Sequence, residues 1–178
     1  MDIKVFSAEK ASATIDLFFS VFRDAGGEEE GRLIGSLVRD LIATTKPGDL
    51  LGFLAVERDE VAGAIFFSRL TFDTPIEAYL LSPVAVDSGH QGRGIGQALI
   101  TYGLDELRFL GAELVVTYGD PAFYSKIGFQ PISDKAIRPP YTLSQPDGWL
   151  GQSLGGGHLD AYEGHVSCVA AFDNPVYW

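Results

Sequence analysis

The chain has little cysteine, few basic residues and no long apolar run. One cysteine among 178 residues excludes both an intramolecular disulfide and a cysteine-based zinc site. No stretch approaches the roughly 18 consecutive apolar residues that a membrane-spanning helix needs. The N-terminal residues show no basic segment followed by an apolar run, which would indicate a signal peptide. These absences predict a protein of the reducing cytoplasm that does not bind membranes.

Basic residues are also outnumbered, because 13 Lys and Arg stand against 24 Asp and Glu, a net charge of −11. Such a charge repels phosphate backbones at long range, so nucleic acid is not expected as the main partner. The acidity is explained either by solubility or by attraction of a cationic substrate. Core-forming residues are abundant, since 46% of the chain is hydrophobic and 12% aromatic. That composition excludes a disordered chain and predicts one domain over residues 1–178.

The spacing of apolar and turn residues predicts an α/β domain. The predicted strands are 2–6, 50–57, 61–72, 77–86, 113–118, 149–154 and 165–172, and the predicted helices are 8–22, 28–44, 94–110 and 121–127. Residues 131–148 contain four of the nine prolines and are predicted to be irregular. Helices follow strands in the middle of the chain, which indicates a mixed sheet with helices on both faces.

Local residues predict where several elements begin and end. Asp24-Ala25-Gly26-Gly27 is expected to separate the first two helices, and a segment around Arg58 is expected to turn a hairpin. Asp120 is a natural N-cap for the short helix that follows it, and Gly128 suits the helix exit. The only cysteine, Cys168, lies in an apolar run and is expected to be a small buried strand residue.

The most informative segment is Gln91-Gly92-Arg93-Gly94-Ile95-Gly96, which follows a predicted strand and opens a predicted helix. Its three glycines remove side chains where a ligand could approach the backbone. The free N–H groups and the dipole of the helix start favour an anion, above all a phosphate or pyrophosphate, and Arg93 can add a charge-assisted contact. Neither the dinucleotide fingerprint nor the P-loop fits this glycine spacing and the residues that follow.

This segment resembles the Gln/Arg-x-x-Gly-x-Gly/Ala motif of the GNAT superfamily of acyl-CoA N-acyltransferases, and Val84-Ala85-Val86 is similar to the strand end that precedes the motif there. A later run, Gly119-Asp120-Pro121-Ala122-Phe123-Tyr124-Ser125-Lys126-Ile127-Gly128-Phe129, resembles the superfamily's second block, a helix followed by Gly-Phe. Its Gly-Asp-Pro form is similar to the YhbS-like branch of predicted N-acetyltransferases. The resemblance covers residues 77–131 and implies a single GNAT-like domain with a mixed, mostly antiparallel twisted sheet.

The resemblance also implies an activity. A protein of this family transfers an acetyl group from acetyl-CoA to a primary amine by direct attack in a ternary complex, and it needs no metal. Acetyl-CoA would lie in a gap between the strands 77–86 and 113–118. Val84, Ala85 and Val86 would contact the pantetheine arm. Pro83 would mark a bulge, unless it is an ordinary proline of an edge strand. The pyrophosphate would be held by Gln91, Gly92, Arg93, Gly94, Ile95 and Gly96.

The resemblance places Tyr124 where the family often has its general acid, which would protonate the leaving thiolate. The alternative is that Tyr124 packs against Phe123 and Phe129. Tyr118 is a weaker candidate for the same task. His90, in the cofactor turn, is expected to face solvent and not to act as a base.

The general base is less well indicated. Some relatives have a glutamate eleven residues before the glutamine of the motif, and here that residue is Leu80. Glu77 is the remaining candidate for this catalytic role, although a surface charge at the strand end explains it more simply. Water relayed through the backbone or Ser82 would also serve. His158 and His165 have no spaced partners that indicate a metal site.

Two other functions stay open. The chain could be an acyl-CoA-binding sensor or structural module without turnover, or a nucleotide-binding regulatory domain, which only the glycines support. The acceptor is a further question. In GNAT-like folds the turn between the first two helices borders the acceptor, and residues 24–30 carry four acidic side chains here. These would favour a cationic small molecule or peptide, unless they only cap the second helix.

Overall fold

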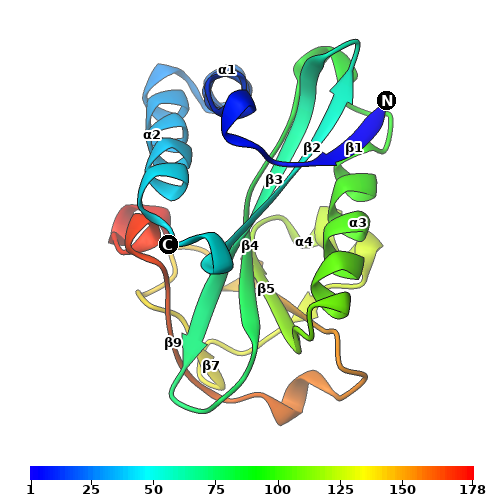
Figure 1. The fold of residues 1–178 in the computed structure, drawn as a ribbon. Coiled ribbons are helices and arrows are strands. Elements are labelled where there is room, and N and C mark those ends of the chain that lie inside the picture. Colours follow the sequence, from blue (N-terminus) through cyan, green and yellow to red (C-terminus); the bar gives the residue numbers. More distant parts are fainter. The chain divides into compact units, whose positions relative to one another are not determined.

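Residues 1–178 are all described by the computed structural model of this protein (Figure 1). They form two units. The first unit consists of Met1–Phe67 and Pro83–Gly103, and the second of Ser68–Ser82 and Leu104–Trp178. Three elements supply residues to both units: β3 (Glu60–Phe72), β4 (Ala78–Val86) and α3 (Ile95–Phe109). The division therefore does not follow the order of the chain.

In the first unit, β1 (Asp2–Val5) pairs antiparallel with β2 (Leu50–Glu57). The next turn, at Arg58 and Asp59, confirms the predicted hairpin. Both residues have positive φ, 49° and 69°, which is the backbone that a two-residue turn between twisted strands requires.

Two helices, α1 (Ala11–Gly26) and α2 (Glu28–Thr44), follow β1. The predicted break over residues 24–27 is too long, because α1 continues through Gly26 and only Gly27, with φ 97°, interrupts the helical chain. The helices pack closely at Gly31, where an added Cβ would lie 2.7 Å from the Phe19 carbonyl oxygen. None of the helices combines the length and the apolarity needed to cross a membrane.

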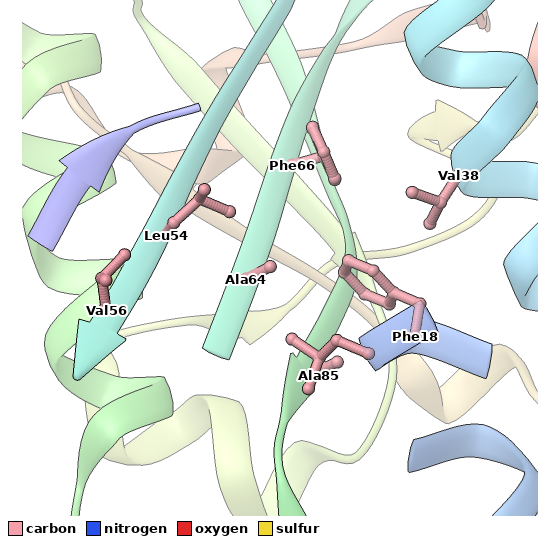
Figure 2. Packing of buried hydrophobic residues seen from close by; sticks show 8 residues of the cluster. Phe18, Val38, Leu54, Val56, Ala64, Phe66 and Ala85 are labelled. Atoms are coloured by element: carbon pink, nitrogen blue, oxygen red, sulfur yellow. The ribbon is translucent and has the colours of Figure 1, made fainter. Parts of the chain in front are cut away.

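Helices cover both faces of the strands in the first unit, as the sequence predicts. On one face, buried side chains from α1, α2 and the strands form a cluster (Figure 2) of Leu17, Phe18, Val38, Leu54, Val56, Ala64, Phe66 and Ala85. On the other face, the first turns of α3 contact the sheet. There the Phe53 and Tyr102 ring centroids are 5.4 Å apart, and a Cβ at Gly103 would lie 2.4 Å from the Phe67 ring.

In the second unit the sheet is mixed. The ladder between β4 and β5 (Leu114–Tyr118) is parallel and joins Ala78–Leu81 to Leu114–Thr117. The antiparallel partner of β5 is β8 (Trp149–Ser153), which also pairs with β6 (Gln130–Pro131). The C-terminal end of β3 pairs antiparallel with β9 (Gly164–Ser167), and β7 (Ile137–Arg138) pairs parallel with β9. The short helix α4 (Pro121–Tyr124) follows β5.

Two sequence predictions need correction in this unit. The segment 131–148 is mostly irregular, as predicted, but it contains β7. The last strand is shorter than predicted, because β9 ends at Ser167 and residues 170–172 form a 3-10 turn. Phe172 leaves the strand direction to pack against Trp178, with ring centroids 6.1 Å apart. Cys168 therefore lies outside the strand and is only half-buried.

Candidate active site

The Gln91–Gly96 turn joins β4 to α3 in the first unit. After β4, Asp87 caps a 3-10 turn over Ser88–His90, since its carboxylate accepts the Gly89 N–H at 3.0 Å. Gly92 and Gly94 both have φ 75°, and a Cβ on either would meet no atom within 4 Å. The two glycines are thus required by their backbone conformation, and the space above them is open.

The turn presents the groups that an anion needs. Residues 91–94 are exposed, whereas Ile95 and Gly96 are buried. The unpaired N–H groups of the first turn of α3 follow directly, and the Arg93 side chain stands in the exposed part. The Gln91 amide donates to the Val86 carbonyl at 3.1 Å, so this side chain braces the turn.

The strand end before the turn is partly buried. The Ala85 side chain belongs to the apolar cluster of the first unit, and Val84 and Val86 are half-buried. The paired part of β4 and β5 ends at Leu81 and Thr117, two residues before Pro83. Residues 84–86 therefore lie outside that ladder, and their contact with pantetheine stays a prediction.

His90 differs from its prediction. It does not face solvent freely but lies half-buried, with Nδ1 2.7 Å from the Asp87 carboxylate and Nε2 3.1 Å from the Glu57 carboxylate. These hydrogen bonds raise the pKa of His90, that with Asp87 most and that with Glu57 next. Glu57 is 33 residues away in the sequence, so no local pattern indicated this contact.

Tyr124 lies at the end of α4 in the second unit. Asp120 caps this helix as predicted, because its carboxylate accepts the Ala122 N–H at 2.9 Å. The Tyr124 ring packs on Gly119, where an added Cβ would lie 2.7 Å from a ring carbon, and its centroid is 5.0 Å from that of Phe123 and 5.6 Å from that of Phe129. The aromatic packing that the sequence offered as an alternative is therefore present, and it fixes the position of the ring.

The protonation of Tyr124 follows from its surroundings. Burial raises the pKa of the phenol, and the Asp120 carboxylate raises it further, while a hydrogen bond with Thr117 offsets part of the increase. The phenol is therefore protonated at neutral pH and can donate a proton.

Cys168 is no nucleophile, because burial raises the pKa of its thiol to about 11.

Tyr118 is engaged in structure. Its hydroxyl accepts the Gln145 N–H at 2.7 Å and lies 2.9 Å from the Ser144 hydroxyl, and its ring stacks on Trp178 at 6.4 Å. These bonds hold the segment before β8 against the end of β5. They leave Tyr118 less free than Tyr124 to donate a proton.

A cavity of about 610 Å³ lies between Tyr118–Pro121 and Ser144–Gly148 in the second unit. Its wall contains two carboxylates, Asp120 and Asp147, and no basic side chain. Gly119, on which Tyr124 packs, is part of the same wall. This cavity was not predicted, because residues 144–148 show no periodicity.

Glu77 has a structural partner. Its carboxylate lies 2.6 Å from Arg69, whose guanidinium also bonds the Tyr79 hydroxyl at 2.9 Å. Glu77 precedes the first pair of the β4–β5 ladder, whereas Thr117, beside Tyr124, belongs to its last pair. Four residues of strand separate these ends, which is roughly 13 Å. The structure thus does not bring Glu77 and Tyr124 together.

The acidic residues at the end of α1 and the start of α2 are partly paired. Asp24 lies 2.8 Å from Arg23 and accepts from Ser88 at 3.3 Å, and Glu28 lies 3.1 Å from Arg32. The contact with Ser88 places the end of α1 beside the start of the cofactor turn. No three His, Cys, Asp or Glu side chains gather in an arrangement that could hold a metal ion.

Known proteins resemble this chain in sequence and structure. The acetyltransferase (GNAT) domain family matches residues 48–131. The chain is 33% identical to an uncharacterized N-acetyltransferase, YjhQ of Escherichia coli K12, over 83% of this chain and 82% of that protein.

Two solved structures are similar over nearly the whole chain. One is the GNAT family N-acetyltransferase YhbS of Escherichia coli in complex with CoA, with TM-score 0.80, 28% identity and coverage of 97% of this chain and 92% of that one. The other is a GNAT family acetyltransferase of Brucella melitensis in complex with acetyl-CoA, with TM-score 0.75, 28% identity and coverage of 97% of each. These similarities agree with the glycine turn and the Gly-Asp-Pro block, and the chain belongs to the GNAT family of acetyltransferases.

Proposed function

We propose that this protein transfers an acetyl group from acetyl-CoA to a primary amine. The observation that carries the proposal is the exposed turn before α3, with two positive-φ glycines and Arg93 beside free backbone N–H groups. Such a turn binds a pyrophosphate, which the acyl donor supplies. The complexes of the two similar proteins with CoA and acetyl-CoA support the same donor here.

The chemistry needs two proton transfers. The neutral amine attacks the thioester carbonyl, a C–N bond forms, and the C–S bond then breaks. Tyr124 donates its phenolic proton to the departing sulfur, and the proton of the attacking nitrogen leaves to water, from which the Tyr124 phenolate is reprotonated. Both products are then neutral at the reacting atoms, and no covalent enzyme intermediate forms.

Thiol release from acetyl-CoA tests the proposal. The protein is mixed with acetyl-CoA and a broad panel of primary amines, and free CoA thiol is measured over time. Release that depends on an amine supports transfer. Tight CoA binding without release by any amine indicates the sensor alternative, and retention on immobilised ATP but not on CoA indicates the nucleotide-binding alternative.

Glu77→Gln tests the second catalytic candidate. A general base contributes roughly 10²–10⁴ in rate, so its loss would lower kcat by that factor. Because Glu77 pairs with Arg69 at the far end of the ladder from Thr117, we expect kcat to stay close to that of the wild type. Steady-state kinetics on the folded variant measures the difference, and a fall of about 10²-fold or more would establish Glu77 as the base.

We further propose that the acceptor carries a second positive charge. The cavity beside Tyr124 has two carboxylates and no cation in its wall, which favours a cationic group there. The net charge of −11 acts in the same direction at longer range. A polyamine or a basic peptide has the required chemistry.

Asp147→Asn tests this preference. Removing one exposed charge should lower kcat/KM for a diamine about 3–10-fold, with little change for a matched neutral amine, and high salt should reduce the difference. Asp134→Asn, an exposed position outside the cavity wall, is the control of equal charge. Equal effects of both variants, or equal use of both amines at all salt concentrations, would contradict a cationic acceptor.

A further inference from the structure

The His90 side chain links two segments of the first unit through both of its ring nitrogens. Nδ1 contacts the Asp87 carboxylate at 2.7 Å within the turn, and Nε2 contacts the Glu57 carboxylate at 3.1 Å at the end of β2. A carboxylate accepts hydrogen bonds, so both ring nitrogens must donate. Only the imidazolium has two N–H groups, and the geometry therefore requires a charged ring.

This link is continuous with the cofactor turn. The Asp87 carboxylate that contacts His90 also accepts the Gly89 N–H, and the Asp87 N–H donates to the Ala62 carbonyl of β3 at 2.9 Å. His90 directly precedes Gln91, the first residue of the turn. The segment that precedes the glycines of the turn is thus held in place against β2 and β3.

We propose that protonated His90 is a positioning residue that holds the Gln91–Gly96 turn in its CoA-binding conformation. The inference rests on the proposed function of that turn. A backbone anion site binds well when its N–H groups are already aligned, because no ordering cost is then left for the ligand. When the ring loses one proton, one ring nitrogen presents a lone pair instead of an N–H to its carboxylate, and that hydrogen bond is lost. Glu57 and Asp87 also lose the positive charge that lies between them.

The charges around the ring determine the pH at which it loses its proton. Glu57, Arg58 and Glu60 face it from the hairpin, and they line a cavity of about 330 Å³ together with Asp87 and His90. Arg93 acts from the turn and lowers the pKa of His90, while Asp24, paired with Arg23, contacts the neighbouring Ser88. The carboxylates outweigh the guanidinium groups, and the pKa of His90 lies above its ordinary value.

The sign of the effect follows from this direction. Because the folded protein favours the charged ring, the link is complete at low pH and is lost as the pH rises through the raised pKa of His90. CoA should therefore bind more tightly below this pH than above it. Reciprocally, CoA binding should draw a proton onto His90 near that pH.

Calorimetric titration with CoA tests the inference between pH 6 and pH 9. The phosphates of CoA titrate in every experiment, so the quantity to compare is the ratio of the Kd of His90→Gln to that of the wild type. We expect a ratio of about 10 at pH 6, which corresponds to 1.4 kcal/mol, and a ratio near 1 at pH 9. Titrations in buffers of different ionisation enthalpy should also show greater proton uptake by the wild type.

Glu57→Gln provides a second variant should His90→Gln fail to fold. It leaves the ring and the turn sequence intact but removes one carboxylate, so the pH at which CoA affinity falls should move down. A Kd ratio that is constant over pH, or a Glu57→Gln profile identical to the wild type, overturns the inference while the CoA site stands. Failure of the wild type to bind CoA at any pH overturns the proposed function together with it.

Discussion

Tyr124→Phe should lower kcat by roughly 10²–10⁴, the usual contribution of a general acid, and leave the KM for acetyl-CoA nearly unchanged. The substitution keeps the ring, so its packing on Gly119 and its edge contacts with Phe123 and Phe129 are retained. Only the hydroxyl is lost, and with it the proton for the leaving sulfur. Steady-state kinetics with an amine identified by thiol release measures both constants.

Thr117→Val is the matched control for this variant. It removes a buried hydroxyl that hydrogen-bonds to Tyr124 and also donates to the Leu81 carbonyl at 2.9 Å, and it keeps the phenol and the side-chain shape. The control should retain most of the activity, because the acid itself is present. Wild-type kcat in Tyr124→Phe would reduce Tyr124 to a packing residue and would assign the proton transfer to another acid.

The same assignment constrains the pH dependence. Burial raises the pKa of Tyr124 above its ordinary value near 10, so the phenol stays protonated over the neutral and mildly alkaline range. At any pH below about 9, deprotonation of Tyr124 therefore cannot be the cause of a fall in kcat. An alkaline fall in CoA affinity belongs to His90 instead, and the two effects separate because one acts on kcat and the other on the Kd for CoA.

The parts of the fold that were predictable depend on residues close together in the sequence. Asp120 caps α4, and Gly128, with φ 89°, ends the 3-10 turn Ser125–Ile127 that follows α4, because capping acts over a few residues. The hairpin turn at Arg58 lies between two runs of strand-forming residues. The glycines at 92 and 94 have the conformations that their identity suggests.

The parts that were not predictable depend on long-range packing. The apolar run after Val166 looks like a strand, but Phe172 turns away from that direction toward Trp178. Nothing local to Gly26 shows that α1 continues through it, since helix packing decides this. The cavity wall at Asp147 exists because Tyr118 bonds residue 145, which is 27 positions away.

The candidate site shows the same division. The cofactor turn and Tyr124 were predicted because each lies in a contiguous block that resembles the family. The contact of His90 with Glu57 joins a 3-10 turn to the end of β2, and the pairing of Glu77 with Arg69 joins the residue before β4 to β3. A side chain's partner across a sheet is set by register, and register is not visible in a single sequence.

Gly94→Glu should abolish CoA binding. The glycine stands at the start of α3 with φ 75° and open space around its missing Cβ, and its carbonyl accepts the Ala98 N–H at 2.9 Å. A glutamate there places a carboxylate at the mouth of the anion site, where phosphate oxygens are expected. The glutamate carboxylate would repel the phosphates of CoA, and its side chain would fill the space that they need. We therefore expect the Kd for CoA to rise at least about 100-fold.

Backbone strain must be separated from this charge effect. A side chain at positive φ costs roughly 1–3 kcal/mol, so Gly94→Glu will lower the melting temperature somewhat. Gly94→Ala imposes the same strain without the carboxylate and should weaken CoA binding about tenfold or less. Gly111→Glu, with φ 86° and equally open surroundings at the end of α3, adds strain and charge outside the turn and should bind CoA like the wild type. Calorimetry on the four folded proteins decides the matter: unchanged affinity in Gly94→Glu would remove the turn from the CoA site, whereas equal losses in Gly94→Ala and Gly94→Glu would assign the effect to backbone conformation rather than to an anion.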